Sequence, residues 1–211
     1  MSDYQTQLAA ETASWLIQDP IARAEKITRE RVRHHKLVRD LLLDRLPTHL
    51  MDVLEVGGGP FPVSDLLQFR MRLVVDPLSR EYATAFPCPD HVAMHAEDLK
   101  SKDRFDLAIC TNALDHVSAP DVVVANIARA LRPGGYAALM CAQDNALTNP
   151  HPAHDINLNA RDIHNWLDAD FETVWELNFE EHNYRYGWVL YEGRRGQPAW
   201  ALLLRKCSGY A

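Results

Sequence analysis

Hydrophobic and polar residues follow two different patterns along the chain, and the change between them falls near Met51. Beyond that point, short apolar runs are separated by stretches with helical spacing. The apolar runs cover 51–56, 72–76, 91–95, 105–110 and 136–142, and the helical stretches cover 62–70, 79–85 and 121–131. Strands that alternate with helices are typical of βαβ units and a parallel sheet. Several of the runs are apolar throughout, as expected for strands that are covered on both faces.

The start of the chain is predicted to be helical. Apolar residues such as Leu8 and Leu16 recur at helical spacing within 5–46. The pair Asp19-Pro20 interrupts this stretch, because proline breaks a helix interior, and a second helix is predicted over 21–46.

The end of the chain changes pattern again. The runs 171–182 and 199–206 are strand-like, with no helix between them, which indicates a closing antiparallel pair. The predicted organisation is therefore a helical N-terminal extension or lid over 1–50 and one α/β domain over 51–211.

The strongest local signal is a glycine cluster that follows the first predicted strand directly. Gly57, Gly58 and Gly59 stand between this strand and a helical stretch. Glycine lets the backbone turn sharply and approach a ligand closely, and a helix start presents free N–H groups. Dinucleotide sites bind pyrophosphate at such a turn. The acidic Glu55 at the strand end suits a ligand without phosphate better.

Five segments together resemble the motifs of the class I S-adenosylmethionine (SAM)-dependent methyltransferases, in that family's order and spacing. The first is Glu55-Val56-Gly57-Gly58-Gly59, and the others cover 74–77, 96–99, 105–117 and 130–136. A glycine cluster alone would be a weak signal, but five motifs in order are a strong one. The resemblance implies a doubly wound, seven-stranded, mostly parallel sheet with the last strand antiparallel. It also implies SAM as cofactor and methyl transfer to O, N or C of a small-molecule acceptor.

The same resemblance implies which residues bind the cofactor. Asp76 is expected to accept hydrogen bonds from the ribose hydroxyls, and the segment 96–99 is expected to border adenine. The expected cofactor-binding residues are Glu55, Gly57, Gly59, Asp76, Pro77, Ala96, Glu97, Asp98 and Asn112. Two alternatives stay open, because Asp76 could serve only as a helix cap and Asn112 could satisfy only loop backbone.

Two positions depart from the family pattern. Pro60-Phe61-Pro62 stands where the family often has a third glycine, which stiffens the turn. His95 stands where the family often has an acidic residue, so adenine contacts are expected to rely on the backbone of Ala96 and Glu97, or on Asp98.

The acceptor is expected beyond the carboxyl ends of the strands, where open α/β sheets bind their ligands. His116 follows the fourth predicted strand and His154 follows the fifth, and both are candidates for a general base, since imidazole titrates near neutral pH. Asp115 is expected to orient a base or to contact the acceptor. Each histidine could instead be a loop or packing residue. The sequence HPAHD (151–155) lacks strong metal-site spacing, so no metal is predicted.

The composition limits which partners and which cellular compartment we expect for this chain. A net charge of −7 argues against nucleic acid as the main partner, because phosphate binding needs a basic surface. No apolar run is long enough to cross a bilayer, and the start of the chain has no signal-peptide pattern. The four cysteines form no CxxC pair, which fits a reducing cytoplasm. We expect a cytoplasmic enzyme without membrane attachment, and a homodimer stays open.

Two other functions stay open on the sequence alone. An NAD(P)-dependent oxidoreductase could use Asp76 for its ribose equally well, although Glu55 and the lack of a third glycine argue against it. A non-catalytic SAM-binding subunit that supports a partner would carry the same cofactor motifs. The histidine-bearing loops favour an enzyme over such a subunit.

Overall fold

A computed structural model describes the chain over residues 3–37, 42, 44–47, 49–86, 89–142, 156–167, 170–179 and 199–208. Its elements are, in order, α1 (Asp3–Trp15), α2 (Pro20–Leu37), β1 (Met51–Val56), η2 (Val63–Leu66), β2 (Phe69–Val75), α3 (Ser79–Tyr82), β3 (His91–Val92), η3 (Ala96–Asp98), β4 (Phe105–Thr111), η4 (Leu114–His116), α4 (Pro120–Ala130), β5 (Leu131–Ala142), α6 (Ala160–Leu167), β6 (Phe171–Phe179) and β7 (Ala199–Lys206). Within the described ranges, no helix has the length and apolar character needed to span a membrane.

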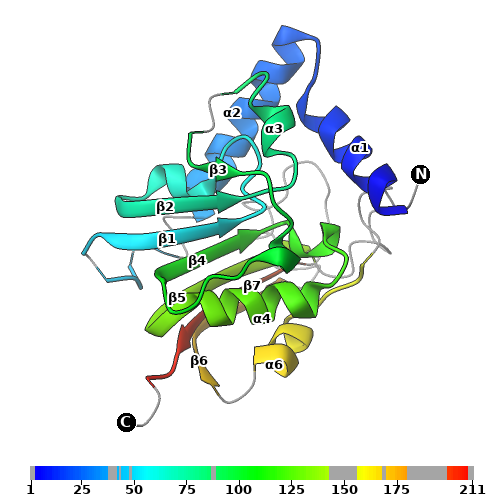
Figure 1. Ribbon diagram of the computed structural model, residues 1–211. Coiled ribbons are helices and arrows are strands. Elements are labelled where there is room, and N and C mark those ends of the chain that lie inside the picture. Colours follow the sequence, from blue (N-terminus) through cyan, green and yellow to red (C-terminus); the bar gives the residue numbers. More distant parts are fainter. Residues whose placement is uncertain are drawn as a thin grey trace.

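All of these strands form one sheet in the order β3-β2-β1-β4-β5-β7-β6 (Figure 1). Strand β7 runs antiparallel to both neighbours, β5 and β6, while the other pairs are parallel. The predicted doubly wound sheet with an antiparallel last strand is therefore confirmed. From β1 the chain winds outward to β3 and then returns to β4 on the other side of β1. Open α/β sheets bind their ligands at such a reversal, beyond the carboxyl ends of the strands.

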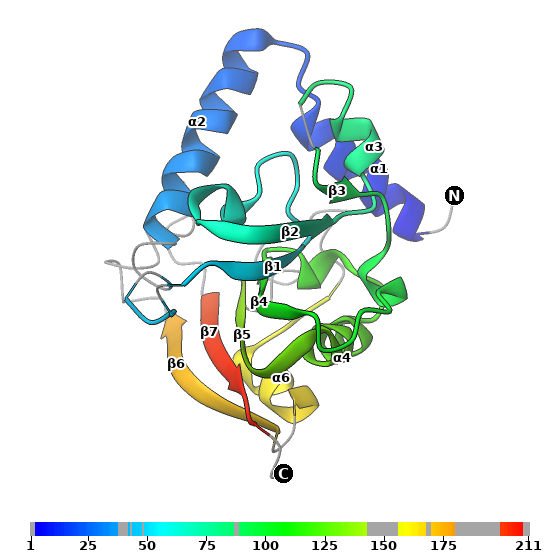
Figure 2. The same cartoon turned by 60° about the vertical axis from the view of Figure 1, so that its left-hand side comes forward.

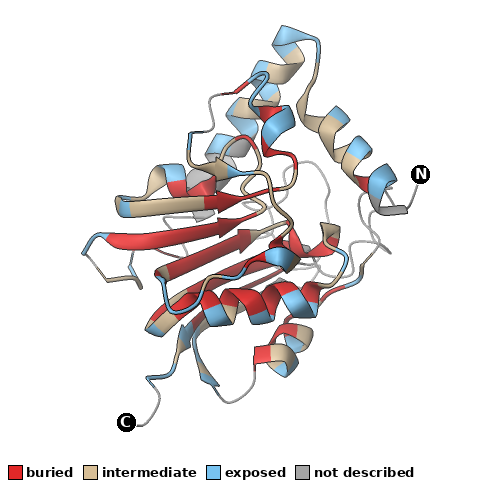
Figure 3. Cartoon of the chain, viewed as in Figure 1, coloured by how far each residue is buried: buried red, intermediate tan, exposed pale blue. Residues whose placement is uncertain are grey.

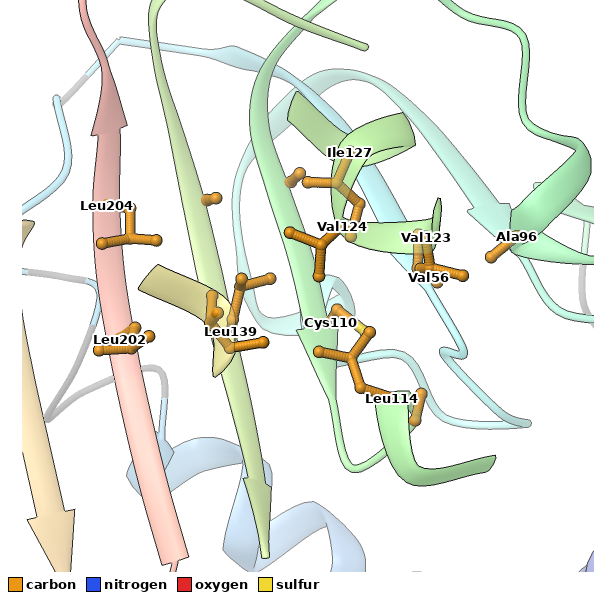
Figure 4. Packing of buried hydrophobic residues seen from close by; sticks show 14 of the residues in the cluster. Val56, Ala96, Cys110, Leu114, Val123, Val124, Ile127, Leu139, Leu202 and Leu204 are labelled. Atoms are coloured by element: carbon orange, nitrogen blue, oxygen red, sulfur yellow. The ribbon is translucent and has the colours of Figure 1, made fainter. Parts of the chain in front are cut away.

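The side chains of the central strands alternate between the two faces of the sheet. Helices α4 and α6 cover one face (Figure 2). There, Val123, Val124 and Ile127 of α4 pack over Cys110 of β4 and Leu139 of β5 (Figure 4). The apolar face of α4 is thereby removed from water. Burial of apolar surface is the main favourable term in folding.

The opposite face is covered by η2 and by residues that follow α2. Val63 and Leu42 pack there with Val53 of β1, Leu107 of β4 and Met140 of β5. In Figure 3 the central strands are buried, and exposed residues concentrate on the outer sides of the helices. With both faces covered, the two ends of the strands are where a ligand can reach the sheet.

Three predicted elements are shorter than the sequence pattern indicated. The helix predicted over 62–70 is the single 3₁₀ turn η2, because β2 already begins at Phe69, which pairs with Met51. The third strand has only two residues, because the chain turns into η3 at Ala96. Helix α3 ends at Tyr82 rather than at residue 85, while the predicted range 38–46 of the second helix lies partly outside the described residues.

Ion pairs join the strands at their amino ends. The Arg70 guanidinium donates hydrogen bonds of 2.8 and 2.6 Å to Asp52, and Arg132 donates to both Asp52 (2.9 Å) and Asp106 (2.6 Å). The hydrogen bond from Arg70 is the largest cause that lowers the pKa of Asp52 to about 2. These charges satisfy one another, so this edge is structural, and the candidate site lies at the opposite edge.

Candidate functional site

The loops that follow β1 and β4 approach each other closely at the carboxyl edge. Gly57 has a φ of +67°, and a Cβ at this position would lie 2.3 Å from the Cβ of Ala113. Its N–H donates to the carbonyl of Val75, at the end of β2 (2.8 Å). Asn112 also has a positive φ, 50°, and donates its N–H to the carbonyl of Met140 (2.8 Å). Position 57 therefore requires glycine for both its backbone conformation and its space.

Asp76 links the ends of β1 and β2. Its side chain is buried, and one oxygen accepts the N–H of Gly59 (3.0 Å) while the other accepts the N–H of Leu78 (2.9 Å). Burial raises the pKa of Asp76 to about 6, against the effect of these two hydrogen bonds, and the charges of Glu11 and Glu81 add to the rise. Pro77, the next residue, is half-buried. Asp76 is thus both a cap for the turn into α3 and an anchor for the glycine loop.

Glu55, the penultimate residue of β1, holds the start of η2. Glu55 is only 1% exposed. Its two carboxylate oxygens accept the N–H groups of Val63 (2.7 Å) and Ser64 (2.9 Å) in η2. Burial raises the pKa of Glu55, while hydrogen bonds from Ser64 and Val63 and the charge of Arg72 oppose the rise. The carboxylate therefore holds the far end of the loop. A direct contact of Glu55 with a cofactor stays a prediction.

The segment predicted to border adenine is held by α4. Asn126 donates its side-chain N–H groups to the carbonyls of Ala96 (3.0 Å) and Glu97 (2.8 Å). The Glu97 carboxylate accepts the N–H of Ser118 (2.8 Å), just before α4. Asp98, by contrast, is exposed. Among the carboxylates of this segment, Asp98 is therefore the one exposed to solvent, whereas Glu97 Oε2 is buried and has no hydrogen-bond partner among the described residues. The backbone of Ala96 and Glu97 is fixed beside them.

Asp115 and His116 lie next to the ends of β4 and β5. The Asp115 residue is 1% exposed, and the Cys141 thiol donates to its Oδ1 at 3.0 Å. Burial raises the pKa of Cys141, so it stays a proton-bearing thiol and can act as this donor. The Nε2 atom of His116 lies 3.7 Å from the same Oδ1, and the His116 side chain is 22% exposed. The predicted pair is thus brought together, whereas His154 lies outside the described residues.

Helix α1 lies beyond the carboxyl ends of β1, β2 and β4 (Figure 1). Trp15, its last residue, has ring atom Cζ2 3.9 Å from where a Cβ on Gly59 would be. The Trp15 indole N–H donates to Glu11 (2.7 Å), and the Trp15 ring lies 6.2 Å from that of Phe61 in the glycine loop. Together with Leu16 and Tyr82, these rings form a small apolar cluster over the loop.

Three residues of the site are absent from the sequence motifs: Asn126, Cys141 and His91. The imidazole Nε2 of His91 lies 3.0 Å from the carbonyl oxygen of Gly59. Each of these side chains supports a motif that lies on another element, so no local pattern identifies them. The described ranges hold no group of three His, Cys, Asp or Glu residues that could bind a metal ion, and the segment 151–155 lies outside those ranges.

The sequence matches the family described as "Methyltransferase domain" over residues 26–185, most of its length. The chain therefore belongs to this family. The predicted class I methyltransferase domain and its SAM dependence are confirmed by this match together with the sheet topology. No curated protein matches the chain.

Several solved structures share the fold. The N-methyltransferase NodS from Bradyrhizobium japonicum WM9, in complex with S-adenosylhomocysteine, has a TM-score of 0.65 at 15% identity, with 98% of this chain and 99% of that one covered. The 1,6-didemethyltoxoflavin-N1-methyltransferase from Burkholderia thailandensis has a TM-score of 0.60 at 17% identity, with 98% and 92% covered. The [4+2]-cyclase SpnF has a TM-score of 0.63 at 19% identity, with 98% and 94% covered. Because a cyclase shares the architecture, these likenesses establish the fold alone.

Proposed function

We propose that the chain binds SAM along the carboxyl edge of the sheet and transfers a methyl group to O, N or C of a small-molecule acceptor. The observation that carries the proposal is the buried Asp76 carboxylate, which is tied to the glycine loop through Gly59. Each of its oxygens accepts one N–H and keeps a further lone pair, so Asp76 can also accept two ribose hydroxyls. NodS and the toxoflavin enzyme are N-methyltransferases, and the latter was solved with its small acceptor, which supports a small-molecule substrate.

The remaining contacts follow the order of the motifs. The loop at Gly57 and Gly59 would hold the methionine part of SAM, and Asn112 would border it from the end of β4. Asp76 and Pro77 would hold the ribose, and the adenine would lie against Ala96, Glu97 and Asp98. Glu55 would act mainly through the loop, because its oxygens accept the N–H groups of η2. Helix α1, within the predicted extension 1–50, would cover the ribose end of the site.

For the chemical step, bound SAM supplies an electrophilic methyl group on a sulfonium. His116 would accept the proton that leaves an oxygen or nitrogen acceptor, which requires the neutral imidazole. Asp115 would orient that imidazole, since its carboxylate lies 3.7 Å from His116 Nε2 and is itself held by Cys141. His154 stays a second candidate for the base. Positioning the acceptor in line with the methyl group would supply most of the rate.

Asp76→Ala is expected to weaken SAM binding by about 1.5–3 kcal/mol, the worth of a hydrogen bond to a charged group. This corresponds to a roughly 10- to 150-fold higher Kd, from a wild-type value expected in the micromolar range. Calorimetric titration with SAM and with S-adenosylhomocysteine measures the change. Asp76→Asn is the matched variant, since it keeps the volume and one carbonyl oxygen and should lose less. An unchanged Kd in a folded Asp76→Ala protein would remove the ribose contact, and no binding by the wild type would remove the site.

SAM affinity is also expected to fall on acidification. Because the pKa of Asp76 is about 6 in the free protein, and ribose hydroxyls donate more strongly to the ionised carboxylate than to the protonated one, binding opposes protonation. Affinity should be full above that pKa and fall by up to about tenfold between pH 7 and pH 5. Titrations across this range, repeated with Asp76→Asn, test the assignment. The asparagine variant should lack this loss, and an equal loss in both proteins would point to another group.

The rival functions make different predictions. An NAD(P)-dependent oxidoreductase would be stabilised by NAD or NADP and not by SAM, and the family match argues against it. A non-catalytic subunit would bind SAM, turn over no acceptor and co-purify with a partner. Screening small amines, alcohols and phenols for SAM consumption separates this case from an enzyme.

We also propose a cytoplasmic location and no nucleic-acid partner. Cys110 and Cys141 are free and buried, which suits a reducing compartment. The net charge of −7 disfavours binding to a phosphate backbone. A homodimer is tested directly by light scattering of the purified protein.

A further inference from the structure

We infer that His91 is a positioning residue for the cofactor loop, which it holds through the backbone carbonyl of Gly59. The inference rests on the proposed cofactor site, which it deepens. His91 is the first residue of β3 and stands in register with Val74 of β2. Its side chain reaches the loop after β1, where Nε2 lies 3.0 Å from the Gly59 carbonyl oxygen.

Both backbone polar groups of Gly59 are therefore hydrogen-bonded to side chains. Its N–H donates to Asp76 (3.0 Å), and its carbonyl accepts from His91 (3.0 Å). Gly59 has a φ of +57°, a conformation that glycine adopts without steric cost but from which it also departs easily. The space that a Cβ would take there is open apart from Trp15 at 3.9 Å, so side-chain packing does not fix the loop at this point. The two hydrogen bonds fix it instead.

The residues after Gly59 offer few other backbone hydrogen bonds, so the bonds to Asp76 and His91 matter more. Pro60 and Pro62 follow Gly59 and have no N–H, so the backbone offers few donors before η2. The next anchored positions are Val63 and Ser64, whose N–H groups are bound by Glu55. Loss of the His91 contact would leave the backbone polar groups of Gly59 bound by Asp76 alone, although Phe61 would stay packed against Trp15 and Phe86.

The protonation of His91 is consistent with this role. Burial lowers the pKa of His91, so the ring is neutral near pH 7. The neighbouring Arg72 charge acts in the same direction, whereas Gly59, Asp65 and Asp90 oppose it. A neutral ring that donates from Nε2 carries no proton on Nδ1. Nδ1 is buried and has no hydrogen-bond partner among the described residues, as this tautomer allows.

The test compares substitutions that keep or move the donor. Glutamine carries an amide N–H at the same number of bonds from Cα as Nε2, whereas asparagine places it nearer the Nδ1 position. His91→Phe and His91→Leu remove the donor and keep the site apolar. His164→Phe is the control, since His164 bonds Glu176 on an element at the far edge of the sheet.

We expect Kd for SAM to rise about 3- to 10-fold in His91→Phe, His91→Leu and His91→Asn, the loss of one neutral hydrogen bond. His91→Gln should stay within about twofold of the wild type, because the donor is restored. The same Kd in a folded donor-free variant as in the wild type would overturn the inference, as would equal loss in His91→Gln and His91→Asn.

Hydrogen exchange in the cofactor-free protein gives a second readout that separates the inference from the proposed function. The Gly59 amide should exchange faster in His91→Phe and His91→Leu than in the wild type and His91→Gln, because its bond to Asp76 opens more often. Unchanged exchange at Gly59 in the donor-free variants would overturn the inference even if SAM binds. Absence of SAM binding by the wild type would instead count against the proposed site alone.

Discussion

Gly57→Ala is expected to destabilise the protein by about 2–5 kcal/mol, and no other backbone position of the site should be as sensitive. A non-glycine residue in the left-handed region costs about 1–2 kcal/mol. In addition, the new Cβ would meet that of Ala113 at 2.3 Å, and overpacking of this kind costs about 1–3 kcal/mol. Relief of the clash would separate the loops after β1 and β4, so SAM binding should be lost in whatever protein still folds.

Gly59→Ala is the matched control for this prediction. Gly59 has a similar φ, +57°, but the atom nearest to its added Cβ is Cζ2 of Trp15 at 3.9 Å, an ordinary van der Waals distance. It should therefore lose only the conformational part, about 1–2 kcal/mol. Urea unfolding of both variants measures the difference. If Gly57→Ala and Gly59→Ala lost the same free energy, the close approach of the two loops would not be what selects glycine at position 57.

The sheet was predictable because its signal is local. Strands β1 and β4 and helix α4 lie within a residue or two of their predicted ranges, since apolar runs and helical spacing repeat over short stretches. The closing pair β6 and β7 followed in the same way from two strand-like runs without a helix between them. Such patterns report which face of an element is buried, and burial is what the fold uses.

Element ends were less predictable, because pairing partners determine them. Residues 62–70 have helical spacing, yet Phe69 and its neighbours gain hydrogen bonds from β1 by becoming a strand. Arg70 then reaches Asp52, a contact that no local pattern encodes. Tertiary contacts thus override a weak local preference, as they do at many helix ends.

The candidate site shows the same contrast between local patterns, which were predictable, and tertiary contacts, which were not. The motifs predicted where Gly57, Asp76 and Ala96 lie, because their spacing along the chain is fixed by the strands. They did not predict that the Glu55 carboxylate would accept the N–H groups of η2. They also did not predict that His91 would hydrogen-bond to the carbonyl of Gly59. Those contacts depend on how a loop packs across neighbouring strands, and the sequence separation of 32 residues between Gly59 and His91 carries no periodic signal.

The Asp115 carboxylate is already held by neighbouring groups before any substrate binds. A carboxylate buried to 1% exposure must be hydrogen-bonded or paired to be stable in its ionised form. Cys141 supplies one hydrogen bond from the end of β5. The 3.7 Å separation from His116 Nε2 is longer than a hydrogen bond but close enough to become one when the acceptor binds. The arrangement therefore favours Asp115 as the group that orients the base rather than as the base itself.

His116→Ala is accordingly expected to lower the single-turnover rate by about 10²–10⁴-fold, the usual worth of a general base. SAM affinity should be unchanged, because no proposed cofactor contact involves His116. Asp115→Asn should lower the rate less and leave SAM affinity intact, since it keeps the volume and removes only the charge that orients the ring. The measurement uses an acceptor found in the screen of amines, alcohols and phenols, with His164→Ala as the surface control and His154→Ala as the competing candidate.

The outcomes distinguish four cases. Loss of rate in His116→Ala with normal SAM affinity, and full rate in His154→Ala, would assign the base to His116. The reverse pattern would assign it to His154. If His116 only positions the acceptor, the loss should appear chiefly in the acceptor's KM and not in the rate at saturation. Full turnover in both variants would remove histidine from the mechanism, and the rate would then come from in-line positioning of an acceptor that is already a good nucleophile.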